Sequence, residues 1–125
     1  MIPSYTKKKN ELKDKQNILN IITGTEVETG RVIDGKKEYM KRINCGNMPD
    51  TNTIKINTGL SNVVYQDFKG IVVDPSSDYS YKMDTKKIND YSILLQLLGN
   101  QINITTYRSS YATCTGYVEV CYLKK

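Results

Sequence analysis

The chain has 125 residues, a formal net charge of +5 and no histidine, which predicts one domain with a single hydrophobic core. The lack of histidine excludes Ser-His-Asp and Cys-His catalytic sites and His-ligated zinc or haem, so we expect no enzyme and no cofactor. No run approaches the about 20 apolar residues that cross a bilayer. No uninterrupted apolar segment follows the N-terminal lysines, so we expect neither membrane insertion nor a signal peptide.

The positive charge is concentrated in the first 24 residues, which hold five lysines against two acidic residues. The other 101 residues therefore carry only +2, and their only arginines are Arg31, Arg42 and Arg108. Nucleic-acid-binding domains instead gather Lys and Arg on their contact face. We therefore expect no nucleic-acid partner.

Residues 1–24 are predicted to form a short helix or an anchor peptide that attaches the chain to other proteins. Apolar residues recur there at a spacing of seven, and Gly24 is typical of a helix end. The repeat spans about two heptads, fewer than the three or four that indicate a coiled coil, so a helix packed on its own domain or on a partner is the alternative. The candidate anchor residues are Tyr5, Leu12, Leu19 and Ile22.

From Thr25 onward the pattern is typical of β-strands. The Asp34-Gly35 pair between two strand-like runs predicts a hairpin, because a type I′ turn requires a positive φ at both central residues. Further strand-like runs alternate with turn residues at intervals of about eight to twelve residues. We expect strands ending at Ile33 and spanning 36–43, 53–57, 79–83, 91–98, 101–106 and 111–123, with β-branched runs at 63–65 and 71–73 on either side of Gly70.

Seven or eight strands after a short helix or anchor indicate an all-β fold, namely an antiparallel β-sandwich that resembles a jelly roll. Residues 1–24 would be the anchor and residues 25–125 the β-sandwich domain. Alternate residues of the last strand should share one face of their sheet. These are Cys114, Gly116, Val118, Val120 and Tyr122.

The three cysteines, Cys45, Cys114 and Cys121, cannot all pair within one chain, and none of their spacings is that of a CxxC metal site. Cys114 and Cys121 are an odd number of residues apart, so on one continuous strand they face opposite sides of the sheet. We expect buried free thiols in a chain made in a reducing cytoplasm. A disulfide is the less favoured alternative.

Ten of the eleven aromatic residues are tyrosines, which suit both sugar stacking and hydrated protein interfaces. Tyr79 and Tyr81 are expected on one side of a strand and could form a glycan platform, with Asp78 accepting hydrogen bonds from sugar hydroxyls. The alternative is that these tyrosines pack into the sheet or against a neighbouring subunit. Arg108, in a loop before the last strand, could contact a receptor or, alternatively, clamp a carboxylate. The candidate glycan contacts are therefore Asp78, Tyr79, Tyr81 and Arg108.

Glu26 and Glu28 lie two apart on a predicted strand and could form a glycosidase carboxylate pair. No other feature supports catalysis, so we interpret them as a solvated strand face. We expect no catalytic and no metal-binding residues.

Four phrases, in this order, carry a resemblance to a known family. They are 30–39 followed by Lys41 and Ile43; Gly46 with Pro49; 58–62; and an ending with Ile102, Ile104, 108–111, Tyr117, Val118, Tyr122 and terminal lysines. In order and spacing, residues 25–125 resemble the C-terminal head domain of tail-fibre and receptor-binding proteins from bacteriophages of low-GC bacteria.

The resemblance implies a virion protein, made in the cytoplasm of a bacterial host, with a β-sandwich that often forms a homotrimer at the tip of a fibre. It implies binding to a surface carbohydrate of the host and brings no catalytic motif. The expected partners are the chain itself, other virion proteins through residues 1–24, and a host surface glycan.

The chain departs from the family at two points. Family members commonly end a much longer fibre chain, whereas 24 residues precede the domain here, and Thr58 stands where the family usually has histidine. A capsid decoration, head-fibre or tail structural protein that acts only through protein contacts is therefore the alternative. A carboxylate-based carbohydrate-active enzyme is a weaker one.

Overall fold

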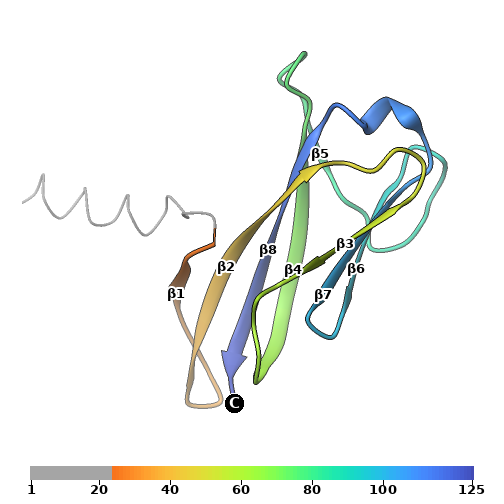
Figure 1. Ribbon diagram of the computed structural model, residues 1–125. Coiled ribbons are helices and arrows are strands. Elements are labelled where there is room, and N and C mark those ends of the chain that lie inside the picture. Colours follow the sequence, from red (N-terminus) through yellow and green to blue (C-terminus); the bar gives the residue numbers. More distant parts are fainter. Residues whose placement is uncertain (1–23) are drawn as a thin grey trace, which may run out of the picture.

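The computed structural model describes residues 24–125, which form eight strands in two antiparallel sheets (Figure 1). The larger sheet has the order β1-β2-β8-β4-β5 and the smaller one the order β3-β7-β6. The predicted all-β sandwich is therefore confirmed. The elements are β1 (Glu26–Ile33), β2 (Lys36–Asn47), β3 (Thr53–Asn57), β4 (Val63–Val73), β5 (Ser80–Lys82), β6 (Ile93–Leu98), β7 (Gln101–Thr106), a 3-10 helix (Ser109–Tyr111) and β8 (Thr115–Lys124).

The last strand, β8, lies at the centre of the larger sheet, between β2 and β4. The smaller sheet is built in the same way, since β7 lies between β3 and β6. The chain crosses between the sheets from β2 to β3 and again from β3 to β4, which Figure 1 shows as a jelly-roll-like path. As a result, loops from distant parts of the sequence meet at each end of the sandwich.

The β1–β2 hairpin turns at Asp34 and Gly35, as predicted. Both residues have a positive φ, 51° and 78°, which a type I′ turn requires. Further along β1, the pairing with β2 shifts between Glu28 and Val32. Such a bulge bends an edge strand and hinders its pairing with another chain.

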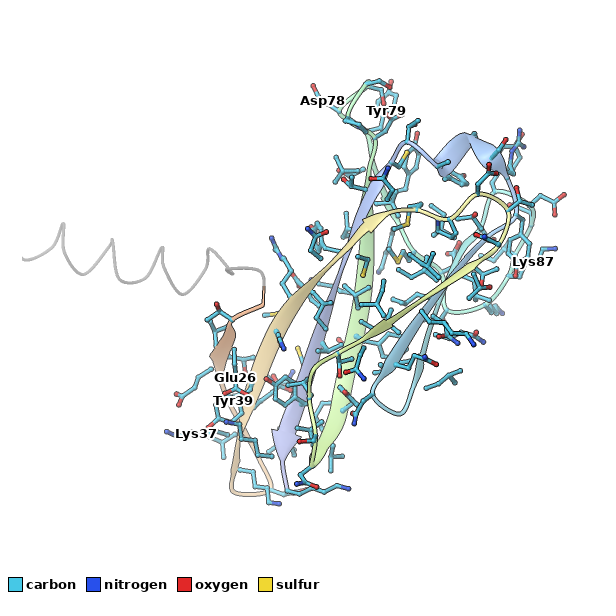
Figure 2. All side chains as sticks on the ribbon, viewed as in Figure 1. Glu26, Lys37, Tyr39, Asp78, Tyr79 and Lys87 are labelled. Atoms are coloured by element: carbon cyan, nitrogen blue, oxygen red, sulfur yellow. The ribbon has the colours of Figure 1, made fainter. Side chains whose placement is uncertain are left out.

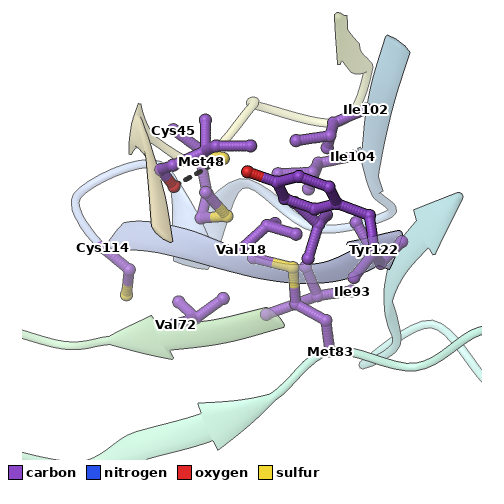
Figure 3. Close-up of a cluster of buried hydrophobic side chains, with 13 residues drawn as sticks. Cys45, Met48, Val72, Met83, Ile93, Ile102, Ile104, Cys114, Val118 and Tyr122 are labelled. Carbon is purple, nitrogen blue, oxygen red and sulfur yellow. Dashed lines mark hydrogen bonds between the residues drawn. The ribbon is translucent and has the colours of Figure 1, made fainter. Parts of the chain in front are cut away.

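The core lies between the two sheets, as Figure 3 shows. Gly116, Val118, Val120 and Tyr122 alternate along β8 and are all buried, and Cys114, just before this strand, is buried with them. The alternation predicted for the last strand is therefore confirmed. Fully burying one large apolar side chain stabilises the fold by about 1.5–3 kcal/mol. The core members are Ile43, Cys45, Met48, Val72, Met83, Ile93, Leu95, Ile102, Ile104, Cys114, Val118, Val120 and Tyr122.

The two β-branched runs, 63–65 and 71–73, lie in the single strand β4. Gly70 lies between them and continues the strand, paired with Val118. The absent side chain leaves room for Met83, since a Cβ at Gly70 would overlap its Sδ atom. The glycine therefore marks a close approach within a strand rather than a break.

Other predicted boundaries were wrong by a few residues. Residue 79 belongs to the turn before β5, because the N–H of Asp74 donates to the carbonyl of Tyr79. The last strand begins at Thr115 and not at Tyr111, because Ser109–Tyr111 forms a 3-10 turn closed by the N–H of Ala112 on the carbonyl of Ser109.

All three cysteines are free, as expected. Cys114 is buried in the core, whereas Cys121 is partly exposed and pairs with Met40 and Asp67 along the sheet. Burial raises the pKa of all three thiols, that of Cys45 to about 11. The thiols therefore remain protonated and weakly nucleophilic at neutral pH.

The predicted anchor or helix, with Tyr5, Leu12, Leu19 and Ile22, lies outside the described residues. The described chain begins at Gly24, whose N–H donates to the carbonyl of Arg42 on β2. Among residues 24–125, no helix has the length and apolar character needed to cross a membrane.

Candidate functional site

Four loops gather at one end of the sandwich, which we call the loop end (Figure 1). They are 48–52, 74–79, 83–92 and 107–114. Hydrogen bonds join three of them, from the N–H of Met48 to the carbonyl of Cys114 and from the hydroxyl of Tyr111 to the carbonyl of Tyr91. Five of the nine tyrosines in the described chain lie in these loops or in the adjoining β5: Tyr79, Tyr81, Tyr91, Tyr107 and Tyr111.

Two of these loops, 83–92 and 107–114, are held together by reciprocal cation–π contacts. The guanidinium of Arg108 lies 4.1 Å from the centroid of the Tyr91 ring, and the ammonium of Lys87 lies 4.2 Å from that of the Tyr107 ring. Each loop thus supplies one cation and one ring. The hydroxyl of Tyr111 adds a 2.8 Å hydrogen bond to the carbonyl of Tyr91. Each of the two cation–π contacts contributes about 0.5–1 kcal/mol at an exposed surface.

Side-chain hydrogen bonds shape the turn that presents Tyr91. The Ser92 hydroxyl accepts from the N–H groups of Ile88 and Asn89, at 2.9 and 3.1 Å. The side-chain oxygen of Asn89 accepts from the N–H of Tyr91 at 2.8 Å. Ser92 is buried, whereas Ile88 and Tyr91 are 67 % and 63 % exposed. The turn therefore holds two large apolar side chains in the solvent.

Arg108 has no carboxylate within ion-pair distance among residues 24–125. The other two arginines each have one: Arg42 lies 2.7 Å from Glu119, and Arg31 lies 3.7 Å from Glu38. The alternative of Arg108 as a carboxylate clamp thus finds no partner in the described chain. Its contact is the ring of Tyr91.

Tyr81 belongs to the same group of side chains. Its ring meets that of Tyr111 edge to face, with centroids 6.2 Å apart, and Tyr111 in turn binds the backbone of Tyr91. We call Tyr81, Lys87, Tyr91, Tyr107, Arg108 and Tyr111 the tyrosine cluster. It includes two of the four residues predicted as glycan contacts.

The other two predicted contacts, Asp78 and Tyr79, lie at the tip of the β4–β5 hairpin, as Figure 2 shows. Tyr79 is 66 % exposed, and Asp78 has a φ of 58° with its N–H on the carbonyl of Asp74. The side chain and N–H of Ser76 both donate to Asp74, which lowers the pKa of that carboxyl. Tyr79 therefore lies on a turn and not beside Tyr81 on a flat strand face.

Four members of the tyrosine cluster were not predicted as site residues: Lys87, Tyr91, Tyr107 and Tyr111. The contact between Tyr91 and Arg108 could have been predicted from the sequence. The register of the β6–β7 hairpin pairs Ile93 with Thr106, and extending it by two residues places Tyr91 opposite Arg108. The contacts of Lys87 and Tyr111 depend on loop paths that no local pattern reveals.

The two carboxylates considered for catalysis are held by neighbouring side chains. Glu26 accepts a 2.6 Å hydrogen bond from the hydroxyl of Tyr122 and a 2.9 Å bond from the ammonium of Lys124. Glu28 lies 3.3 Å from the ammonium of Lys37, and Figure 2 shows Lys37 with Glu26 and Tyr39 nearby. Glu26 and Glu28 lie on the exposed face of β1, as expected from the sequence, and Glu26 is in addition bound to Tyr122 and Lys124 of β8.

The electrostatics of Glu26 suit a structural role. Burial acts to raise the pKa of its carboxyl, but the hydrogen bonds from Lys124 and Tyr122 outweigh it and lower the pKa overall. A glycosidase general acid requires the opposite shift. Burial, and next the bond to Glu26, raise the pKa of Tyr122 far above its ordinary value.

A hollow of about 440 Å³ is lined by residues 27–30 of β1. Two more lie on the flank where β4 and β6 face each other, and one of these reaches Asp84 and Thr85 of loop 83–92. These two hollows, of about 320 and 400 Å³, share Asp67 and Phe68 as lining residues. Leu95 and Leu97 of β6 line the opposite side. Within residues 24–125, no group of three or more Cys, Asp or Glu side chains could hold a metal ion.

Comparison with models of known protein families gave no match to the chain. Neither the curated proteins nor the solved structures gave a match.

Proposed function

We propose that this chain is a non-enzymatic bacteriophage virion protein that binds a surface carbohydrate of its host through the tyrosine cluster. The virion part of the proposal rests on the resemblance of residues 25–125 to tail-fibre head domains. In this proposal the chain is made in the host cytoplasm and acts in the virion. It forms a homotrimer at a fibre or tail tip, and residues 1–24 attach it to other virion proteins.

The observation that carries the binding part is the exposed ring of Tyr91, fixed between two loops. Sugar-binding surfaces combine aromatic faces with polar groups, and tyrosine offers both with few rotatable bonds. Arg108 covers one side of the Tyr91 ring, and the 63 % exposure of this residue leaves much of the remainder in solvent. Because the loops are already joined, little ordering cost opposes binding.

The absence of catalysis is part of the proposal and is supported by the state of Glu26. A carboxylate whose pKa is lowered and whose two oxygens both accept hydrogen bonds is a poor general acid. Glu28 is 56 % exposed on its side chain and pairs with Lys37. The Glu26 contacts join β1 to β8, the Glu28 contact joins β1 to β2, and neither carboxylate is left poised for proton transfer.

Binding of the full chain to an array of bacterial surface polysaccharides, and to whole low-GC bacteria, tests the proposal. We expect Tyr91→Ala to weaken binding at least about tenfold, because a central aromatic anchor is removed. Leu98→Ala is the matched control, since Leu98 is 56 % exposed and is the last residue of β6, at the opposite end. Wild-type protein that binds no polysaccharide and no cell would contradict the proposal, as would equal binding by the two variants.

A structural role through protein contacts alone is the second candidate. Three exposed apolar side chains at the end opposite the loops favour it: Val32, Val64 and Leu98, at 65 %, 45 % and 56 % exposure. A virion neighbour could cover them. If Leu98→Asp blocks incorporation into particles and no glycan is bound by wild type, the structural role is the better account.

A further inference from the structure

We infer that the ligand of the tyrosine cluster is an anionic saccharide, and that Arg108 binds its carboxylate, phosphate or sulfate group. This inference rests on the proposed function, because it names the ligand class of the same site. It follows from the charge and the orientation of groups at the loop end.

Arg108 differs from the other arginines in having no acidic partner in the described chain. Arg42 is bound to Glu119 at 2.7 Å, and Arg31 lies near the buried Glu38. The guanidinium carbon of Arg108 instead lies 4.1 Å from the centroid of the Tyr91 ring. Within residues 24–125 the arginine side-chain N–H groups that donate hydrogen bonds are those of Arg42, so the N–H donors of Arg108 are free to bind a ligand.

The charges around Arg108 favour an anion. Loops 83–92 and 107–114 contain three cations, Lys86, Lys87 and Arg108, and two acids, Asp84 and Asp90. Asp90 lies 3.4 Å from Lys87 and neutralises part of its charge. Lys86, which is exposed, and Arg108 have no acidic partner within residues 24–125. The two loops that hold Tyr91 therefore have a small excess of positive charge, whereas loops 48–52 and 74–79 contribute three acids, Asp50, Asp74 and Asp78.

The geometry distinguishes an acidic sugar from a neutral one. A planar carboxylate or a phosphate can accept two parallel N–H bonds from one guanidinium, which is stronger than a bond to a sugar hydroxyl. The loops already hold Arg108 in place, through Tyr91 and through the bond from Tyr111 to the Tyr91 carbonyl. The sugar ring can then lie on the exposed part of Tyr91 while its anionic group lies at Arg108.

The test measures binding of the full chain to dextran, polygalacturonate, dextran sulfate and poly(glycerol phosphate) at about 0.15 M salt, where surface charges more than about 8 Å apart are screened. We expect at least one of the three anionic polymers to bind about tenfold or more tightly than neutral dextran. The anionic polymer that binds identifies whether carboxylate, sulfate or phosphate is preferred.

Three arginine variants then locate the anion. Arg108→Gln should lose about tenfold in affinity for that polymer, and Arg108→Lys should retain an intermediate affinity because it keeps the charge without the fork of donors. Arg31→Gln is the matched control, since it removes the same charge from a 69 % exposed side chain near the opposite end. Hydrogen exchange of residues 88–92 shows whether each variant keeps the loop structure.

The outcomes separate this inference from the proposed function. Equal binding of dextran and the anionic polymers overturns the inference and leaves carbohydrate binding intact. Equal losses in Arg108→Gln and Arg31→Gln also overturn it, because they indicate attraction by net charge alone. Wild type that binds none of these polymers and nothing on the polysaccharide array contradicts the proposed function and the inference with it.

Discussion

At the scale of single residues, the hydroxyl of Tyr122 connects the core to the first strand. Tyr122 is fully buried, and its ring stacks on Tyr39 and meets Tyr65 edge to face. Its hydroxyl donates to Glu26, which is on β1 at the sheet edge. Lys124 completes the group by binding Glu26 and lying 4.3 Å from the centre of the Tyr39 ring. An edge strand is thus fastened to the centre of the sheet.

We predict that Tyr122→Phe lowers the free energy of unfolding by about 1.5–3 kcal/mol at neutral pH, since a buried hydrogen bond to a charged group is lost. The folded pKa of Glu26 lies below its ordinary value of 4.5. Its contribution is therefore present above that value and declines as the pH falls through the folded pKa. Urea unfolding of both proteins from pH 7 to pH 3 measures this. If the difference in unfolding free energy between the two proteins stays constant or grows toward low pH, the Tyr122–Glu26 hydrogen bond is not its source.

Gly70 and Gly116 matter because two methionines fill the space beside them. A Cβ at Gly70 would overlap Met83 Sδ and lie 2.9 Å from its Cγ and 3.1 Å from Leu95 Cδ2. At Gly116 the closest atom is the terminal methyl of Met48, which can move more easily. The sequence showed Gly70 only as an interruption of a strand-like run, since the approach of Met83 depends on tertiary packing.

We predict that Gly70→Ala destabilises the protein by about 1–3 kcal/mol through overpacking, and that Gly116→Ala costs less. Denaturant unfolding of wild type and of both variants gives the three free energies of unfolding, which can be compared directly when the denaturant slopes are equal. The packing account would be wrong if Gly116→Ala were the more damaging change.

At the scale of elements, the sequence predicted hairpins better than loops. The turns at Asp34-Gly35 and Gly99-Asn100 were found because local residue types specify them. The 3-10 turn of Ser109–Tyr111 was missed, since the expected last strand ran through it. Its position depends on contacts of Tyr111 with Tyr81 and with the backbone of Tyr91, which lie far apart in sequence.

We predict that Tyr111→Phe loosens the pair of loops without unfolding the sandwich. The variant loses the hydrogen bond to the Tyr91 carbonyl, worth about 1 kcal/mol, and keeps the aromatic contact with Tyr81. Amide exchange in residues 88–92 should become faster, while exchange in β8 stays unchanged. Affinity for the polysaccharide that binds wild type should fall as well.

Unchanged exchange at residues 88–92 would show that the Tyr111 hydroxyl does not hold the loop. Tyr117→Phe is the control for this variant, because the Tyr117 ring lies on β8 under Arg42 of β2 and its hydroxyl makes no hydrogen bond within residues 24–125.

At the scale of the whole molecule, the division into two ends is the feature most relevant to function. The all-β fold could be predicted because turn residues recur at short intervals. The tyrosine cluster could be predicted only in part, because Tyr81 and Arg108 were identified while their neighbours are brought to them by the crossing of strands between sheets. Tyr79 was misplaced because the turn beginning at Asp74 extends to it.

We predict that the protein is a stable trimer, as its resemblance to fibre head domains implies. Light scattering of the full chain at micromolar concentration should give three times the chain mass of 14.3 kDa. If the subunits assemble through the end opposite the loops, charged substitutions at the exposed Val32 and Val64 should lower the mass that light scattering measures. A stable monomer would contradict the trimer.

The most direct measurement is hydrogen exchange of the full chain with and without the polysaccharide that it binds on the array. The account predicts slower exchange confined to residues 76–92 and 107–112. Slower exchange only at the β4–β6 flank or at the β1–β2 turn, with no change in residues 86–92 and 107–112, would contradict the account.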